Sequence, residues 1–251
     1  MTTAGITLVS YNVWFGEHFL AERRRALMDI LRAADADVIG LQEVTPGLLA
    51  VLLAQDWVRD GYHFAEVSVA PYGVMVLSRR PTTRFVEHAL PTRMGRSLVI
   101  AEIDDLAVGV VHLESLRYAD TRRQQLVTIF PILDTYPHAV LMGDFNMCSS
   151  WDENRQLDPR YTDIWPHLHG DEPGWTEDTE VNKMRLLVNA RPTKVRFDRV
   201  IVRSTEERWR PVHIERLGTE PVSPDLPDVF PSDHFGLRAR LAFSPDGGTS
   251  P

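Results

Sequence analysis

The sequence predicts an α/β fold, a sandwich of two mixed β-sheets with helices on the outside. Short runs of β-branched and apolar residues recur along most of the chain, and each has the length of one strand. Two segments with apolar residues at helical spacing lie between some of these runs. Strict strand–helix alternation, which is typical of a doubly wound parallel sheet, does not occur, and this favours two mixed sheets.

The order of these patterns predicts the individual elements. Residues 6–13 combine β-branched and apolar side chains and predict the first strand, and apolar residues at helical spacing predict a helix over 20–34. Residues 37–41 predict a buried strand, after which Gln42 and Glu43 are expected to leave the sheet. A second helix is predicted around 126–133. Six further strands are predicted, at residues 73–78, 97–103, 107–112, 139–142, 197–202 and 236–243.

Length and composition predict a folded chain with one domain. The 251 residues are 43% hydrophobic and 25% charged, which excludes general disorder. We expect a single catalytic domain over 1–243 and a flexible tail over 244–251, where Gly, Pro, Ser and Thr are frequent. Apolar runs are too short to cross a bilayer, and the N-terminus lacks the basic region of a secretory signal, so a cytoplasmic location is expected. Cys148 is the only cysteine, which excludes an intrachain disulfide and a cysteine-built zinc site.

The charge balance limits how the protein could bind nucleic acid. Asp and Glu number 35 against 27 Lys and Arg, which gives a net charge of −8. A protein that coats long duplexes normally carries the opposite sign. Any contact with nucleic acid is therefore expected to be local. Lys183 and Lys194 are the only lysines, so nearly every cation is an arginine.

Polar and ionisable residues recur where the predicted strands end. One such residue is more typical of a turn or a cap than of a catalyst. Together, however, they combine carboxylates that suit a hard cation with amides and histidines that suit phosphate oxygens. Because strand ends present side chains to a shared cleft, the set predicts a catalytic site. Its members are Asn12, Gln42-Glu43, 112–115 (His-Leu-Glu-Ser), 143–146 (Gly-Asp-Phe-Asn), Asp198 and 232–234 (Ser-Asp-His).

Four of these segments resemble the endonuclease/exonuclease/phosphatase superfamily, which contains DNase I and the abasic-site endonucleases. They are Asn12 after a strand, 41–44 (Leu-Gln-Glu-Val), 143–146 and 231–234 (Pro-Ser-Asp-His), and their order along the chain also matches. The resemblance runs from about Thr7 to Leu241 and implies a four-layer α/β/β/α sandwich, the DNase I-like fold.

Further motifs resemble one branch of that superfamily, the tyrosyl-DNA phosphodiesterase 2 subfamily. These are 94–98 (Met-Gly-Arg-Ser-Leu), 112–115 and 196–201 (Arg-Phe-Asp-Arg-Val-Ile). The resemblance implies Mg²⁺-dependent hydrolysis, with Mn²⁺ as a substitute, of the bond between tyrosine and a 5′ DNA phosphate. It implies DNA 5′ ends carrying a tyrosyl adduct as the partner, with no membrane and no obligate protein partner. Two positions depart from the pattern: Tyr11 stands where the family usually has Trp, and Glu177 stands where a second aromatic is expected.

Roles for the site residues follow from this resemblance and from the chemistry of phosphodiester hydrolysis. Glu43 is the expected metal ligand, and Asp233 is expected to share the metal through a water. Asp144 is expected to orient or deprotonate the attacking water, and Asn146 to hold that water or the phosphate. Asn12 is expected to steady Glu43 and the phosphate. His234, oriented by Asp198 or Asp233, is expected to act on the phosphoryl oxygens or the leaving group. His112 is the expected second phosphate donor, and the expected substrate-binding residues are Arg96, Ser115, Arg117 and Trp175.

Simpler interpretations stay open at this point. Glu43 could cap a helix that begins at Pro46, and residues 143–146 could be only a turn. His112 could be a structural histidine, and Arg96 and Arg117 could be solvated surface charges. The catalytic core of the superfamily also serves general nucleases and phosphatases acting on lipid or sugar phosphates, and a fold does not fix the substrate. A non-catalytic binding module with the same fold is a further alternative.

Overall fold

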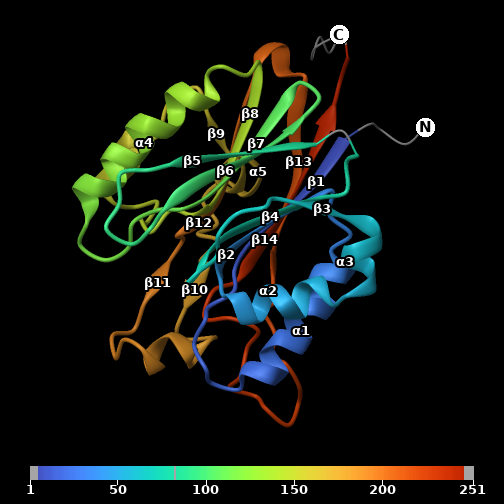
Figure 1. Cartoon of the computed structure of the whole chain (residues 1–251). Helices are drawn as coiled ribbons and strands as arrows, with labels where there is room; N and C mark the ends of the chain where they lie inside the picture. The colour runs from blue at the N-terminus through green and yellow to red at the C-terminus, as the bar shows by residue number, and fades with distance from the viewer. Residues whose placement is uncertain (1–4, 82, 246–251) are drawn as a thin grey trace.

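The computed structural model describes residues 5–81 and 83–245, which form two six-stranded sheets and a small two-stranded one (Figure 1). The first sheet contains β1 (Gly5–Asn12), β2 (Val38–Val44), β3 (His63–Phe64), β4 (Gly73–Ser78), β13 (Trp209–Leu217) and β14 (Gly236–Phe243). The second contains β5 (Arg84–Ala89), β6 (Ser97–Ile103), β7 (Leu106–His112), β8 (His138–Asp144), β9 (Thr162–Asp163) and β12 (Asp198–Ser204). The small pair is β10 (Glu177–Asp178) with β11 (Lys194–Val195). The helices are α1 (Leu20–Ala33), α2 (Pro46–Leu53), α3 (Asp56–Gly61), α4 (Ala119–Leu133) and α5 (Ile164–His169), with 3₁₀ turns η1 (Asp152–Gln156), η2 (Lys183–Leu187) and η3 (Thr205–Glu207).

Both large sheets are mixed. The strand orders are β13-β14-β1-β2-β4-β3 and β5-β6-β7-β8-β12-β9. The pairs β1–β2 and β7–β8 are parallel, and the other pairs in these sheets are antiparallel. β14, the last strand, lies between β13 and β1 in the interior of its sheet.

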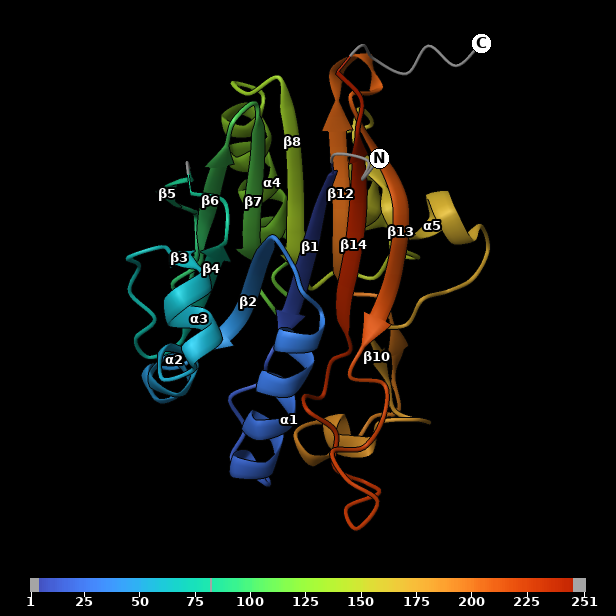
Figure 2. The same ribbon diagram turned by 90° about the vertical axis from the view of Figure 1, so that its right-hand side faces the viewer.

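The layers follow from the burial of both faces of each sheet. One apolar core lies between the sheets and includes Leu8, Val38 and Val140. A second lies under α1 and α2 on the outer face of the first sheet, and a third lies under α4 on the outer face of the second. Strands such as β2 are apolar on both faces for this reason, since Ile39 packs outward while Val38 packs inward. Figure 2 shows the resulting arrangement edge-on, and the predicted α/β/β/α sandwich is confirmed.

The predicted elements all occur, with shifts at their ends. β2 continues to Val44, and Gln42 and Glu43 form an irregularity inside it rather than leaving the sheet. The second helix begins at Ala119, much earlier than predicted. Its first two turns carry mostly polar side chains, so the apolar pattern did not reveal them. The tail predicted over 244–251 lies mainly outside the described residues, which end at 245. Within the described parts of the chain, no helix is both long and apolar enough to cross a membrane.

Two unusual backbone conformations, at Glu43 and Gly143, position polar side chains at one edge of the sandwich. Glu43 has a left-handed φ of +62° at the point where the pairing of β2 with β4 shifts register. Gly143 has φ +142°, and a Cβ there would lie 1.9 Å from the carbonyl oxygen of Val111 on β7. Only glycine allows β8 to approach β7 this closely just before Asp144. The close contact between these two parallel strands therefore determines the position of Asp144.

Candidate active site

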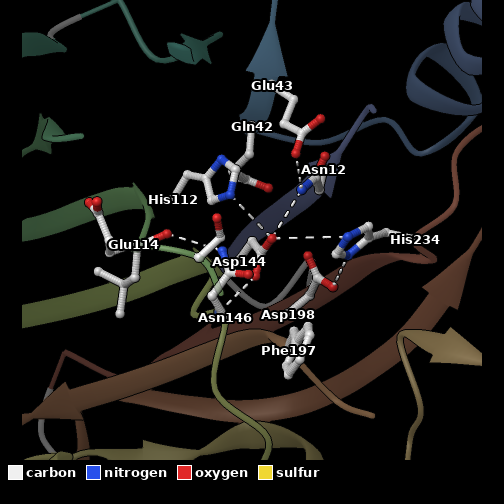
Figure 3. A network of polar contacts seen from close by, with 12 residues as sticks. Asn12, Gln42, Glu43, His112, Glu114, Asp144, Asn146, Phe197, Asp198 and His234 are labelled. Carbon is white, nitrogen blue, oxygen red and sulfur yellow. Dashed lines mark hydrogen bonds and ion pairs between the residues drawn. The ribbon is translucent and has the colours of Figure 1, made fainter. Parts of the chain in front are cut away.

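Asp144 is the centre of a polar network where the two sheets meet (Figure 3). Its Oδ2 accepts a hydrogen bond from Asn12 Nδ2 at 3.0 Å and lies 3.4 Å from His112 Nε2. Its Oδ1 accepts the backbone N–H of Asn146 at 2.8 Å, which closes a local turn. Residues 143–146 therefore do form a turn, but they are not only a turn, because the turn also holds Asp144 in the network. Because Asn12 ends a strand of the other sheet, its hydrogen bond joins the two sheets.

Glu43 lies next to Asn12 and lines the cleft. Its Oε1 accepts from Asn12 Nδ2 at 3.3 Å, and its Oε2 accepts the backbone N–H of Phe15 at 3.3 Å. The interpretation of Glu43 as a helix cap is wrong, because α2 is capped by Thr45, whose side chain accepts the backbone N–H of Leu48. The Glu43 carboxylate is therefore not used by the helix and lines the cleft.

His234 lies between two carboxylates. Its Nδ1 is 2.8 Å from Asp198 Oδ2, and its Nε2 is 3.1 Å from Glu177 Oε1. Burial disfavours the imidazolium, but Asp198 and Glu177 outweigh it and raise the pKa of His234 well above its usual range. The two carboxylates therefore favour the cationic form of the ring. Of the two carboxylates expected to orient it, Asp198 makes the direct contact, whereas Asp233 Oδ1 is 4.0 Å from Nε2.

His112 is neutral and contacts both Asp144 and Arg96. Arg96 Nη1 lies 3.1 Å from His112 Nδ1, and Nη2 lies 3.2 Å from Nε2. An arginine only donates, and a neutral imidazole accepts at one nitrogen. The consistent arrangement has Nδ1 accepting from Arg96 and Nε2–H directed at Asp144. Burial, together with the charge of Arg96, outweighs Asp144 and lowers the pKa of His112 to about 3. Arg96 itself is buried, so it is not a solvated surface charge.

The carboxylates of the site create an excess of negative charge. Burial, with Glu177 and Glu43 close by, raises the pKa of Asp233 to about 7, and burial raises the pKa of Glu43 as well. A divalent cation beside these two carboxylates would offset this charge. Among the described residues, no group of three or more His, Cys, Asp or Glu is arranged to hold a metal. Glu43 and Asp233 are nevertheless oxygen donors of the kind that bind a hard divalent cation, which can take one or two carboxylates and keep several waters.

These side chains open onto a cleft of about 820 Å³. Eight of the predicted residues line it: Glu43, Arg96, His112, Ser115, Asp144, Asn146, Asp233 and His234. Asn12 and Asp198 lie behind this lining and hold it through hydrogen bonds. Two predicted substrate-binding residues are not brought to the cleft. Arg117 is exposed outside its lining, and Trp175 is partly exposed, with its carbonyl accepting from Arg216 Nη1 at 3.0 Å.

Sequence reasoning missed several residues of the cleft. Aromatic side chains line it at Trp14, Phe15, Tyr72, Trp151 and Phe197. Glu177 and Arg185 also line it, from a segment that we call the arm, residues 177–195, which contains β10, η2 and β11. Thr176 fixes the base of the arm, because its hydroxyl accepts the backbone N–H groups of Phe197 and Asp198, both at 3.1 Å. Strands of two residues have no periodicity, and of the arm the sequence motifs singled out only Glu177, as a departure from the subfamily pattern.

Comparison with known proteins places this geometry in a wider group. Residues 9–234 match the family described as the Endonuclease/Exonuclease/phosphatase family. Tyrosyl-DNA phosphodiesterase 2 of Xenopus laevis is 26% identical over 249 residues, which cover 92% of this chain and 65% of the relative. The chain thus spans slightly less than two thirds of that relative. The 5′-tyrosyl-DNA phosphodiesterase of Caenorhabditis briggsae is 26% identical and covers 94% of this chain and 69% of the relative.

A solved structure is similar over nearly the whole of both chains. It is the crystal structure of D. rerio TDP2 complexed with single strand DNA product, with a TM-score of 0.81 and 26% identity. The similarity covers 95% of this chain and 99% of that one. An endonuclease/exonuclease/phosphatase family protein from Bacteroides thetaiotaomicron, 16% identical with a TM-score of 0.73, shares the fold.

Proposed function

The chain belongs to the endonuclease/exonuclease/phosphatase family, and on that basis we propose that it is a metal-dependent phosphodiesterase that hydrolyses the bond between tyrosine and a 5′ DNA phosphate. One observation carries the chemistry. Polar side chains from separate strand ends of two sheets converge on Asp144, which lies within 4.0 Å of Asn12, His112 and His234, and Asn12 in turn contacts Glu43. Such convergence is typical of a site for phosphoryl transfer.

The expected reaction is attack of water on phosphorus and breakage of the bond from phosphorus to the tyrosine oxygen. Asp144 is suited to orient the water and accept its proton, and Asn146 lies beside it on the same turn. Cationic His234 is suited to stabilise the phosphoryl oxygens or to give a proton to the leaving oxygen. His112 directs its Nε2–H at Asp144, and as a donor to phosphate it would exchange this contact for one with the substrate. Mg²⁺, when held by Glu43 with Asp233 nearby, supplies charge stabilisation of the phosphoryl group.

DNA as the substrate is supported by the relatives and by the arm. Two relatives are named for 5′-tyrosyl or tyrosyl-DNA phosphodiesterase activity, and the D. rerio structure is a complex with single-strand DNA product. Both lysines of this acidic chain, Lys183 and Lys194, lie on the arm, as do Arg185 and Arg191. Three of these four cations line the cleft. The arm also carries Glu177, Asp178 and Glu180, so its charges nearly balance, and this fits local contact with a short DNA end rather than with a long duplex.

The proposal is tested by parallel hydrolysis assays with Mg²⁺. The substrates are a 5′-phosphotyrosyl oligonucleotide, an abasic duplex of matched sequence and an inositol phosphate. We expect the phosphotyrosyl oligonucleotide to turn over fastest, with free tyrosine and a 5′ phosphate as products. Faster turnover of either other substrate would replace the proposed substrate. Hydrolysis of none of them, with Mg²⁺ or Mn²⁺, would favour a binding module.

A further inference from the structure

Glu177 occupies the face of His234 that is directed at the cleft. The other ring nitrogen, Nδ1, is taken by Asp198 at 2.8 Å. Nε2 is therefore the only nitrogen of the ring available to substrate, and Glu177 Oε1 lies 3.1 Å from it. A carboxylate oxygen at this distance has the charge and hydrogen-bonding geometry of a phosphoryl oxygen. In the substrate-free protein, Glu177 thus fills a position that an anionic group of the substrate needs.

Glu177 has a second cationic partner on the arm. Its Oε2 accepts from Arg185 Nε at 2.9 Å, and Arg185 is partly exposed and lines the cleft. The backbone of Glu177 is fixed, because β10 pairs with β11 and Thr176 is bonded to β12. The carboxylate therefore bridges His234 and Arg185 from a fixed strand. A substrate phosphate has to break only the contact of Oε1 with His234, because Oε2 is already held by Arg185.

We propose that Glu177 is a gate on His234, a carboxylate that the substrate phosphate must displace toward Arg185 before it can reach Nε2. The inference rests on the proposed function, because a gate of this kind acts only on anionic ligands. Orientation of His234 does not require Glu177, since Asp198 already holds the opposite nitrogen from a fully buried position at the start of β12. The contact on Nε2 instead competes with the substrate.

The gate makes Glu177 a residue that determines specificity. A ligand that offers only a phosphate, such as inorganic phosphate, must displace Glu177 with the phosphate interactions alone. Arg191 and Lys194 of the arm line the same cleft, and a DNA end that contacts them gains binding energy that offsets the displacement. The site therefore discriminates against small phosphates and in favour of phosphates attached to a longer strand.

The test compares steady-state kinetics of Glu177→Gln and wild type on a 5′-phosphotyrosyl oligonucleotide. Gln has the same shape and still accepts a hydrogen bond, but it lacks the charge, so phosphate displaces it more easily. Since hydrogen bonds to charged groups are stronger than neutral ones by a factor of about two in free energy, we expect KM to fall roughly fivefold to tenfold with kcat within twofold. The inhibition constant of inorganic phosphate should fall by the same factor. Asp178→Asn is the matched control, because it removes one carboxylate from the same strand at a residue that bonds only within the arm.

Each outcome decides the matter. A fall in kcat with an unchanged KM would show that Glu177 supports the chemical step and would overturn the gate. An equal fall in KM in Asp178→Asn would show a general electrostatic effect, which also overturns it. If wild type hydrolyses the oligonucleotide and Glu177→Gln has an unchanged KM, the gate is wrong while the proposed function stands. If wild type hydrolyses nothing, the proposed function fails, and the gate is then decided by inorganic phosphate binding measured by calorimetry in the two proteins.

A double-mutant cycle with Arg185 provides a second route that does not depend on the folding of one variant. In Arg185→Met the Glu177 carboxylate loses its second partner and is held by His234 alone. The substrate phosphate then displaces it less easily, so KM should rise severalfold. In Glu177→Gln/Arg185→Met, residue 177 has no carboxylate to compete with the phosphate at His234. The rise in KM should therefore largely disappear. If Arg185→Met raises KM equally in wild type and in Glu177→Gln, Arg185 binds the phosphate directly. This result would overturn the displacement of Glu177 toward Arg185.

Discussion

Replacement of Asp198 by Asn tests the role of the His234 cation most directly. Asp198 Oδ2 lies 2.8 Å from His234 Nδ1, both side chains are buried, and within the described chain Asp198 Oδ1 has no hydrogen-bond partner. Asn has nearly the same shape and can still turn an oxygen toward Nδ1. The substitution therefore removes the charge of this contact while it leaves the packing in place.

The expected size of the effect follows from this contact. A hydrogen bond to a charged group contributes about 1.5–3 kcal/mol, and in the transition state the phosphoryl group, rather than Glu177, is expected at Nε2. Asp198 is then the remaining carboxylate in direct contact with the imidazolium. Loss of this stabilisation lowers kcat by roughly 10- to 150-fold. KM should change little, because the loss is felt mainly where charge develops.

The pH profile gives an independent readout. In the native protein the two carboxylates raise the pKa of His234, so the charged form persists to high pH. Removal of the Asp198 charge lowers that pKa, and the ring then loses its proton at a lower pH. The alkaline limb of the kcat profile should therefore move to lower pH in Asp198→Asn.

The assay is single-turnover hydrolysis of a 5′-phosphotyrosyl oligonucleotide between pH 6 and 10, with circular dichroism to verify folding. A kcat within twofold of wild type, or an alkaline limb that does not move, would refute the argument that Asp198 acts through the charge of His234. A higher KM with an unchanged kcat would assign Asp198 to binding instead.

Three further predictions follow from the site and its supports. Glu43→Gln should weaken Mg²⁺ and Mn²⁺ binding in calorimetric titration and abolish most activity with the fold intact, and an unchanged metal affinity would move the ligand elsewhere. Asp144→Asn and His234→Ala should each lower kcat by about 10², and the double variant should be less impaired than the product of the two, whereas additive losses would separate their roles. Gly143→Ala should lower the free energy of unfolding by roughly 2–5 kcal/mol in urea, because its Cβ would lie 1.9 Å from the Val111 carbonyl oxygen; a loss below 0.5 kcal/mol would contradict this steric argument.

Most of the strands that the sequence predicted are buried on both faces, and β14 is an exception, with Arg240 exposed. β1, β2, β7 and β8 read as continuous apolar runs because each is covered on both sides. β5 and β13 were not predicted, since β5 is an edge strand with charged and partly exposed side chains. β13 is also an edge strand, and Pro211 lies at its register shift.

The site shows the same division between local and tertiary information. Asn12, Glu43, Asp144 and His234 could be predicted because each follows or precedes an apolar strand run. Glu177 could not, because its position depends on contacts of Thr176 with segments far along the chain.

Motif spacing also identifies a segment better than it identifies a side-chain direction. Leu116 has φ +60°, and it lines the cleft while its neighbour Arg117 does not. The motif at 112–115 therefore pointed to the correct loop, but it did not indicate which side chains of that loop face the cleft.

The position of β14 has a consequence for the biosynthesis of the protein. This strand is inserted between β13 and β1, and the segment just before it carries Asp233 and His234. A ribosome-bound chain that ends before residue 230 has an open first sheet and no imidazolium at the cleft, although Glu43 and Asp144 are already made. We therefore expect the proposed hydrolytic activity to require insertion of β14, and a product that terminates before residue 230 to lack it.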